Sequence, residues 1–234
     1  MKILQKGFNY SQDGPGNRLV YHLQGCNFKC KWCSNADSIP LENSKAKDYT
    51  VSELFDEIMR SRMMFFDGGG VTFTGGEACV QAEELTELLK LLRQNGIHTA
   101  IETNGSYLSL RQMSEFIDYL IVDLKHFNEE EHIRWTGASN ASTKANLEYF
   151  FNQGRQIHVR IPVINGVNAQ PEGFAEYFSR FDTSNAVFEF LAYHEYGKDK
   201  WQGSYQIENG FVSNEIIRKF TDIFNRNGLK TVAT

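Results

Sequence analysis

Three cysteines lie close together in residues 25–35, where they could bind a metal centre. Cys26, Cys30 and Cys33 follow one another at the spacing CxxxCxxC. Thiolates separated in this way can converge on one face of a compact turn, as the cysteines that hold iron–sulfur clusters do. A structural zinc site usually takes four protein ligands. A set of three thiolates therefore favours a four-iron cluster in which one iron has no protein ligand.

Two other uses of the cysteines compete with a cluster. The fourth cysteine, Cys79, lies far along the chain, and it or a histidine could complete a zinc site. From the spacing alone, a cluster and a zinc ion therefore stay open as alternatives. A disulfide framework is not expected, because four cysteines in 234 residues and no apolar leader in residues 1–9 indicate a reducing compartment. Cys79 itself is predicted to be a small core residue.

The sequence around the cysteines resembles a known family, the radical S-adenosylmethionine (SAM) enzymes. Their hallmark is a CxxxCxxC loop with an aromatic residue before the last cysteine, and Trp32 fills that place. Further motifs resemble the glycyl-radical-enzyme activases of this superfamily, most of all the pyruvate formate-lyase branch. These motifs are Asp13-Gly14-Pro15-Gly16, Asn35, Thr74-Gly75-Gly76-Glu77, Asp123-Leu124-Lys125 and residues 193–201. The resemblance covers nearly the whole chain and implies a single domain of residues 1–234.

The resemblance implies an oxidoreductase of the [formate-C-acetyltransferase]-activating type, active in anaerobic metabolism. Its cofactors would be a [4Fe-4S] cluster and S-adenosylmethionine. In the family, an electron from the cluster cleaves S-adenosylmethionine to methionine and a 5′-deoxyadenosyl radical, which takes a hydrogen atom from a glycine of a partner enzyme. The expected partner is a glycyl radical enzyme, most of all pyruvate formate-lyase, and the expected electron donor is flavodoxin or ferredoxin.

The resemblance also implies which residues hold the cofactors. The three loop cysteines would bind the cluster. S-adenosylmethionine would contact Trp32, Cys33, Ser34, Gly75, Gly76, Glu77, Asn104, Asp123, Leu124, Lys125 and His194. Gly75 and Gly76 allow a close backbone approach to a ligand. Glu77 offers a carboxylate to the ammonium group of the cofactor, and Lys125 offers a point charge to its carboxylate.

Some of these residues depart from the family pattern or have a plain structural alternative. Ser34 stands where the pyruvate formate-lyase branch commonly has histidine. In that branch, residues at the places of Glu102, Thr103 and Asp123 help hold a monovalent cation, but Glu102 replaces the usual aspartate, which puts its role in question. Asp123 and Lys125 could instead form a structural ion pair. His194, taken alone, is more typical of a structural histidine.

Two segments are candidates for contact with the partner enzyme. One contains Asp13, Gly14, Pro15 and Gly16, and the other contains Tyr196, Lys198 and Trp201. The alternative for both is an ordinary solvent-exposed turn.

Strands and helices are expected to alternate along the chain. Short apolar runs predict six strands, at residues 18–24, 71–74, 98–103, 119–125, 157–164 and 186–193. Apolar residues at helical spacing predict a helix that starts at the capping box of Thr50 and Glu53, and further helices at about 81–94, 110–117, 145–151, 174–181 and 216–224. Pro162 is expected to mark the end of its strand or a bulge.

This alternation predicts a parallel α/β sheet with right-handed crossovers. Eight such units close a barrel, so six predict a partial (β/α)6 TIM-type barrel, which is also the radical SAM fold that the resemblance implies. Reactive groups of such barrels gather at the carboxyl ends of the strands. Five predicted strands end in polar groups, which are the cysteine loop, Gly76-Glu77, Glu102-Thr103-Asn104, Asp123 with Lys125, and His194.

The composition excludes some functions and leaves two rivals. Hydrophobic residues at 41% and aromatic residues at 13% supply a core, and a net charge of −5 without a basic block argues against nucleic-acid binding. No apolar run has the length of a membrane span, so a cytoplasmic protein is expected. One rival is a small-molecule radical SAM enzyme such as a deazapurine synthase, which does not account for residues 194–201. The other is a zinc-stabilised binding module, which would contain no iron.

Overall fold

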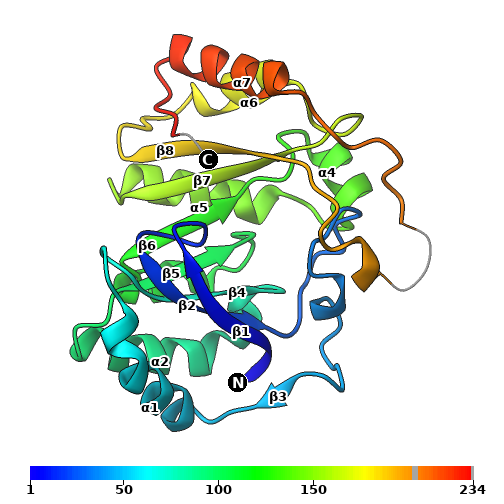
Figure 1. The fold of residues 1–234 in the computed structure, drawn as a ribbon. Helices are drawn as coiled ribbons and strands as arrows, with labels where there is room; N and C mark the ends of the chain where they lie inside the picture. The colour runs from blue at the N-terminus through cyan, green and yellow to red at the C-terminus, as the bar shows by residue number, and fades with distance from the viewer. Residues whose placement is uncertain (202–204, 233–234) are drawn as a thin grey trace. The chain divides into compact units, whose positions relative to one another are not determined.

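The computed structural model describes residues 1–201 and 205–232. These residues divide into two compact units, whose strands and helices are labelled in Figure 1. The first unit holds residues 1–27, 37–103 and 107–120, and the second holds residues 28–36, 104–106 and the described residues from 121 onward. The single domain of residues 1–234 stays a prediction.

The first unit is built on a mixed sheet. Strands β2 (Asn17–Leu23), β4 (Gly70–Gly75) and β5 (Thr99–Thr103) are parallel, while β1 (Lys2–Tyr10) runs antiparallel to both β2 and the short β3 (Lys47–Asp48). The sequence predicted the three parallel strands but not β1 or β3. Four consecutive residues of β1 are exposed, so this strand lacks the apolar pattern that identifies a buried one.

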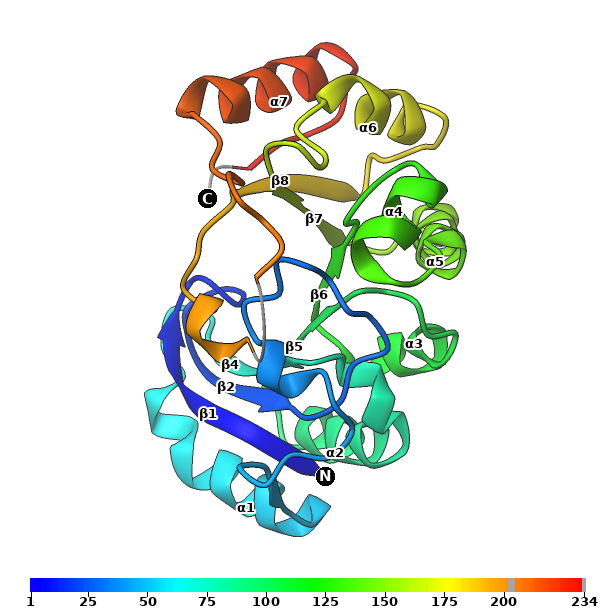
Figure 2. The same cartoon turned by 90° about the vertical axis from the view of Figure 1, so that its right-hand side faces the viewer.

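The helices of the first unit follow the predicted signals. Helix α1 (Val51–Ser61) begins at the expected capping box, in which the Glu53 N–H donates to Thr50 and the Thr50 N–H donates to the Glu53 carboxylate at 2.7 Å. Helix α2 (Ala82–Gln94) follows the 3-10 turn η3 (Ala78–Gln81) and lies beside α1 in both views (Figures 1 and 2). Its predicted apolar face is fully buried and consists of Leu85, Leu88, Leu89 and Leu92. The shorter helical segments are η1 (Ala36–Ser38), η2 (Arg62–Met64), α3 (Ser109–Met113) and η4 (Ser114–Phe116). The first residue of η1 belongs to the second unit.

The second unit carries three parallel strands. Strand β6 (Tyr119–Asp123) enters this unit at residue 121 and pairs with β7 (Ile157–Val163), which pairs with β8 (Ala186–Ala192). Pro162 lies one residue before the end of β7 and stays in register with Leu191, so it marks the end of the strand rather than a bulge.

Five helical segments complete the second unit. They are α4 (Glu129–Thr136), α5 (Ala141–Asn152), α6 (Pro171–Phe178), the 3-10 turn η5 (Lys198–Lys200) and α7 (Asn214–Arg226). Helix α4 is not among the helices that the sequence predicted. Its Asn128 accepts a hydrogen bond from the Glu131 N–H at 3.0 Å, and Gly137 ends the helix in the left-handed conformation.

Aromatic rings fill the core of the second unit. The rings of Phe178 and Phe188 lie 4.7 Å apart, and those of Phe190 and Phe224 lie 4.8 Å apart. These contacts join α6 and α7, which lie side by side in both views, to β8 (Figures 1 and 2). Among the described residues, none of the helices has the length and apolar character needed to cross a membrane.

The predicted alternation of strands and helices is confirmed. The six predicted strands are β2, β4, β5, β6, β7 and β8, and a helix follows each of them along the chain. The fold class is therefore α/β with predominantly parallel strands, as expected.

Candidate functional site

The start of the cysteine loop is tied to the end of β4 within the first unit. The Gly76 N–H donates to the Leu23 carbonyl at 2.9 Å, and the Glu77 N–H donates to the Gly25 carbonyl at 2.8 Å. On its other side, the Cys26 N–H donates to the Ile39 carbonyl at 3.0 Å. The backbone at the first cysteine is thus held between two segments of the chain.

Both glycines of the Gly75-Gly76 pair are required by close backbone contacts. Gly75 has φ +114°, and a Cβ there would lie 2.3 Å from the Leu23 nitrogen. A Cβ at Gly76 would lie 2.2 Å from the Gly25 carbonyl oxygen. Gly75 therefore packs against β2 and Gly76 against the start of the cysteine loop, and their predicted contact with a ligand stays a prediction.

Glu77 has a buried carboxylate with a fixed orientation. Its side chain is 1% exposed, and its Oε1 accepts hydrogen bonds from the Cys79 N–H at 2.9 Å and from the Thr103 hydroxyl at 2.5 Å. Next to Thr103, Glu102 accepts a hydrogen bond from the Thr74 hydroxyl at 2.9 Å. The ends of β4 and β5 therefore place two carboxylates in the first unit.

The second half of the cysteine loop packs on the end of α4 in the second unit. The Lys29 N–H donates to the Thr136 carbonyl at 2.7 Å, and the Lys31 N–H donates to the Trp135 carbonyl at 3.0 Å. These bonds satisfy two of the carbonyls that a helix leaves without partners at its carboxyl end. The loop and α4, the helix that the sequence missed, thus support each other.

Cys33 is held from two sides within the second unit. Its N–H donates to the Cys30 carbonyl at 3.0 Å, and its carbonyl accepts a hydrogen bond from the indole N–H of Trp201 at 3.0 Å. Trp32, the aromatic residue of the motif, is buried, and Ser34 is half-buried. Trp201, predicted as a partner contact, therefore touches the cysteine loop itself.

A row of charged side chains crosses β6, β7 and β8 on one face of the strands. Asp123, Arg160 and Glu189 are register partners on the three strands. Arg160 donates to Glu189 at 2.6 Å, and His158 lies 3.0 Å from the same carboxylate oxygen. Burial alone would raise the pKa of Glu189, but the hydrogen bond from His158 and the charge of Arg160 lower it below its usual value.

Sequence analysis missed Arg160 and Glu189, although charged residues inside otherwise apolar strands were a usable signal. The predicted pair of Asp123 and Lys125 is present, with Nζ and Oδ2 2.6 Å apart. Leu124, between them, is fully buried and its N–H donates to the Arg160 carbonyl at 2.9 Å.

His194, which follows β8, and Asn104 both belong to the second unit. The Tyr196 N–H donates to Nδ1 of His194 at 3.4 Å, and the two rings stack at 4.4 Å. Burial lowers the pKa of His194, which favours the neutral imidazole. Asn104 is buried, and its carbonyl accepts a hydrogen bond from the Thr143 hydroxyl at 2.8 Å.

The two candidate partner segments differ in structure. Arg18 is fully buried under residues 13–16, where it donates to the Pro15 carbonyl at 3.0 Å, and Thr72 donates to the Asp13 carbonyl at 2.8 Å. Burial lowers the pKa of Arg18 to about 10. In the second unit, Tyr196 is 88% exposed, while Lys198 pairs with Glu195 at 2.9 Å.

The three cysteines of the loop are divided between the two units. Cys26 belongs to the first unit, and Cys30 and Cys33 belong to the second. Among the described residues, no three Cys, His, Asp or Glu side chains are grouped so that they could hold a metal ion, and none of the four cysteines forms a disulfide. The assignment of the cluster ligands therefore stays a prediction.

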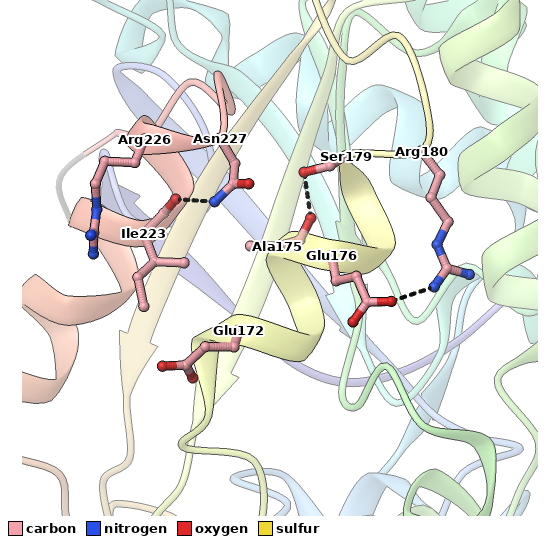
Figure 3. Close-up of a pocket in the computed structure, with 8 residues that line it drawn as sticks. All are labelled: Glu172, Ala175, Glu176, Ser179, Arg180, Ile223, Arg226 and Asn227. Carbon is pink, nitrogen blue, oxygen red and sulfur yellow. Dashed lines mark hydrogen bonds and ion pairs between the residues drawn. The ribbon is translucent and has the colours of Figure 1, made fainter.

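The second unit contains a pocket whose lining residues are drawn in Figure 3. It is a surface groove between α6 and α7, lined by Glu172, Ala175, Glu176, Ser179, Arg180, Ile223, Arg226 and Asn227. The ion pair of Glu176 and Arg180 at 2.9 Å lies within this lining. The groove contains none of the residues predicted to bind a cofactor.

Comparison with known proteins gives a consistent family match. Residues 20–178 match the model of the Radical SAM superfamily. The chain is 34% identical over 196 residues to the pyruvate formate-lyase 1-activating enzyme of Escherichia coli (strain K12), covering 81% of this chain and 79% of that protein. It is 28% identical over 288 aligned positions to the 4-hydroxyphenylacetate decarboxylase activating enzyme of Clostridioides difficile (strain CD196), covering 93% of this chain and 90% of that protein.

A solved structure supports the same match. The structure of a domain of a pyruvate-formate lyase-activating enzyme from Bacteroides vulgatus ATCC 8482 has a TM-score of 0.60 and 27% identity, and covers 71% of this chain and 99% of that chain. The predicted resemblance, and with it the partial-barrel fold class, is confirmed.

Proposed function

The chain belongs to the radical SAM superfamily, and on this premise we propose that it is an activating enzyme that generates the radical of a glycyl radical enzyme. The observation that carries the proposal is the family match of residues 20–178, because this range contains the CxxxCxxC loop and the Gly75-Gly76-Glu77 turn. The likeness to two activating enzymes over most of the chain supports the reaction type.

The residues present fit a [4Fe-4S] cluster and S-adenosylmethionine. The loop supplies three thiols, and its backbone is fixed by hydrogen bonds at Cys26 and at Cys33. We assign Cys26, Cys30 and Cys33 as the cluster ligands. When bound, this cofactor pair supplies reductive cleavage of S-adenosylmethionine and a 5′-deoxyadenosyl radical that takes a hydrogen atom from glycine.

The charged residues at the strand ends suit the methionine part of the cofactor. The Glu77 carboxylate complements an ammonium group, and the Lys125 ammonium complements a carboxylate. His194 accepts the Tyr196 N–H at Nδ1, so its proton lies on Nε2, which can donate to the cofactor. The further residues that we assign to S-adenosylmethionine are Trp32, Cys33, Ser34, Gly75, Gly76, Asn104, Asp123 and Leu124.

A monovalent cation near the methionine part is a finer proposal. Its candidate ligands are Glu102, Thr103 and Asp123. The Thr103 hydroxyl donates its proton to Glu77. The lone pairs of the Thr103 hydroxyl oxygen can therefore face a cation.

The proposed partner is pyruvate formate-lyase. The identity of 34% to a pyruvate formate-lyase activase favours it over other glycyl radical enzymes. A decarboxylase of the kind activated by the Clostridioides difficile relative is the second candidate, because that alignment covers more of the chain. We propose flavodoxin or ferredoxin as the electron donor, since the cluster needs a low-potential electron. We propose the cytoplasm as the location of the protein.

The proposal is tested by anaerobic purification followed by metal analysis and electron paramagnetic resonance (EPR). We expect about four irons per chain and, after reduction, S-adenosylmethionine-dependent formation of a glycyl doublet on pyruvate formate-lyase of the host. Colourless protein that contains zinc supports the binding module and contradicts the proposal. Cleavage of S-adenosylmethionine without a doublet on any glycyl radical enzyme of the host favours a small-molecule radical enzyme.

A further inference from the structure

Residues 197–201 in the second unit contact three consecutive residues of the cysteine loop. The indole N–H of Trp201 donates to the Cys33 carbonyl at 3.0 Å. The ammonium group of Lys200 donates to Oδ1 of Asn35 at 2.8 Å. Between them, the backbone of Gly197 lies against the Ser34 carbonyl. We call residues 197–201 the 197–201 turn.

The contact at Gly197 leaves no space for a side chain. A Cβ at this position would lie 2.1 Å from the Ser34 oxygen and 2.4 Å from the Ser34 Cα. Gly197 has φ −99° and ψ 4°, and this negative φ does not itself require glycine. The glycine is therefore required by the close approach of two backbones rather than by its own dihedral angles.

The 197–201 turn is itself held in place within the second unit. The Lys198, Lys200 and Trp201 N–H groups donate to backbone carbonyls three residues earlier. The Trp201 ring packs edge-on against Tyr205 at 5.4 Å, and the Tyr205 hydroxyl lies 2.9 Å from that of Tyr193. The 197–201 turn can therefore act as a fixed support for residues 33–35.

We propose that Trp201 and Gly197 are positioning residues for the cluster ligand Cys33, an inference that rests on the proposed function. The Trp201 hydrogen bond and the Gly197 contact fix the backbone on the carboxyl side of Cys33, while the Cys30 carbonyl fixes its amino side. Groups that orient metal ligands commonly change metal affinity by about 10- to 100-fold when they are removed. Because only three thiolates hold the cluster, misplacing one of them removes a large fraction of the affinity for the cluster.

The test compares two variants of the 197–201 turn with two matched controls in the full chain, reconstituted with iron and sulfide without oxygen. Trp201→Phe removes the N–H and keeps an aromatic ring, and Gly197→Ala introduces the blocked Cβ. The first control is Thr221→Val, since the hydroxyl of Thr221 donates to the Ile217 carbonyl in its own helix. The second is Gly7→Ala, since a Cβ at Gly7 meets nothing within 4 Å.

The measured quantities are iron per chain, the rate of iron release to a ferrous chelator, the EPR spectrum of the reduced cluster and the urea unfolding midpoint. We expect both turn variants to release iron about 10-fold faster than wild type, with a changed EPR spectrum. Both controls are expected to release iron at the wild-type rate and keep its spectrum.

The possible failures are distinguishable. Wild-type protein without iron contradicts the proposed function, and the inference falls with it. If the wild-type protein binds iron and both turn variants release it at the wild-type rate with the wild-type spectrum, the inference is wrong. The proposed function is not affected by that result. Equal acceleration in turn variants and controls overturns it as well, because the effect is then not specific to the 197–201 turn. A turn variant that does not fold is replaced by Lys200→Met, which removes only the bond to Asn35 and is expected to accelerate release less.

Discussion

The hydroxyl of Thr103 donates a hydrogen bond to Oε1 of Glu77 at 2.5 Å. Thr103 is the last residue of β5, whereas Glu77 follows β4, and the Cys79 N–H donates to the same oxygen. A buried carboxylate with two donors is held in one orientation, because charge-assisted hydrogen bonds are stronger and shorter than neutral ones. The end of β5 thus sets the direction of the acidic residue in the Gly-Gly-Glu turn.

Replacement of Thr103 should therefore weaken both the fold and cofactor binding. Thr103→Val removes a donor from a buried carboxylate, which should lower the free energy of unfolding by about 1–3 kcal/mol. Anaerobic equilibrium dialysis should show weaker S-adenosylmethionine binding as Glu77 loses its orientation. Thr103→Ser keeps the hydroxyl and should remain close to wild type in both measurements. If the valine variant matches wild type, Thr103 does not orient Glu77.

Cys79 should be dispensable for the cluster. Burial, together with the charge of Glu77, raises the pKa of the Cys79 thiol well above its usual value, and only thiolates bind iron well. Cys79→Ala should keep the wild-type iron content, whereas Cys30→Ala should lose most of it. The measurement is iron per chain after anaerobic reconstitution. A Cys79→Ala protein depleted of iron would identify Cys79 as a fourth ligand.

His132 should make the stability of the second unit depend on pH. Burial lowers the pKa of His132 to about 4, and its Nδ1–H donates to the Ala138 carbonyl at 2.6 Å. The usual value is 6.5, so the unfolded chain binds the proton more tightly. The stabilisation is therefore complete above pH 6.5 and is lost as the pH falls from 6.5 to 4, with a loss of about 2 kcal/mol by pH 5.

The comparison with His132→Asn isolates this contribution from the carboxylates, which also titrate in acid. The difference in unfolding free energy between wild type and variant should shrink by about 2 kcal/mol between pH 7.5 and pH 5 in urea titrations of the apoprotein. The ring of His132 contacts Phe28 of the cysteine loop at 5.2 Å, so protonation should loosen the loop as well. A difference that stays constant with pH would show that His132 is not buried as a neutral group.

Local signals made much of this structure predictable. The capping box of Thr50 and Glu53 located α1, and the polar residues after the apolar runs located the strand ends. The start of α4 carried a similar signal in Asn128, which was overlooked beside three consecutive acidic residues. Strand β1, which pairs with β2 and with the two-residue β3, gave no signal, because its exposed residues follow no alternation.

Long-range contacts at the candidate site were not predictable from one sequence. Trp201 and Cys33 are 168 positions apart, and nothing in the intervening residues indicates that an indole bonds that carbonyl. Arg160 and Glu189 are 29 positions apart, and their pairing depends on the register of two parallel strands. Such contacts arise only once the strands are aligned.

Breaking the buried pair of Arg160 and Glu189 should lower the free energy of unfolding, whereas replacing both residues should change it little. Glu189→Gln removes the carboxylate charge that Arg160 contacts at 2.6 Å, and the free energy of unfolding should fall by about 3–5 kcal/mol. A double variant with methionine at both positions should recover most of this loss, since it buries no charge. Urea denaturation at pH 7.5 gives both values. A loss below about 1 kcal/mol for the single variant would mean that water compensates Arg160.

The turn at residues 13–16 should affect recognition of the partner enzyme. Gly14 has φ +122°, and a Cβ there would lie 3.2 Å from the buried side chain of Arg18, so Gly14→Ala should displace the turn. Gly68→Ala is the matched control, because Gly68 has φ +78° and open space around it. In activation assays that measure the glycyl doublet, Gly14→Ala should raise the KM for pyruvate formate-lyase about 10-fold, equivalent to 1.4 kcal/mol of binding, with a smaller change in kcat. The control also places alanine at a positive φ, but away from residues 13–16, and it should leave the KM unchanged. Equal KM values for the two variants would assign residues 13–16 a structural role only, because the strain and not the contact would then account for the effect.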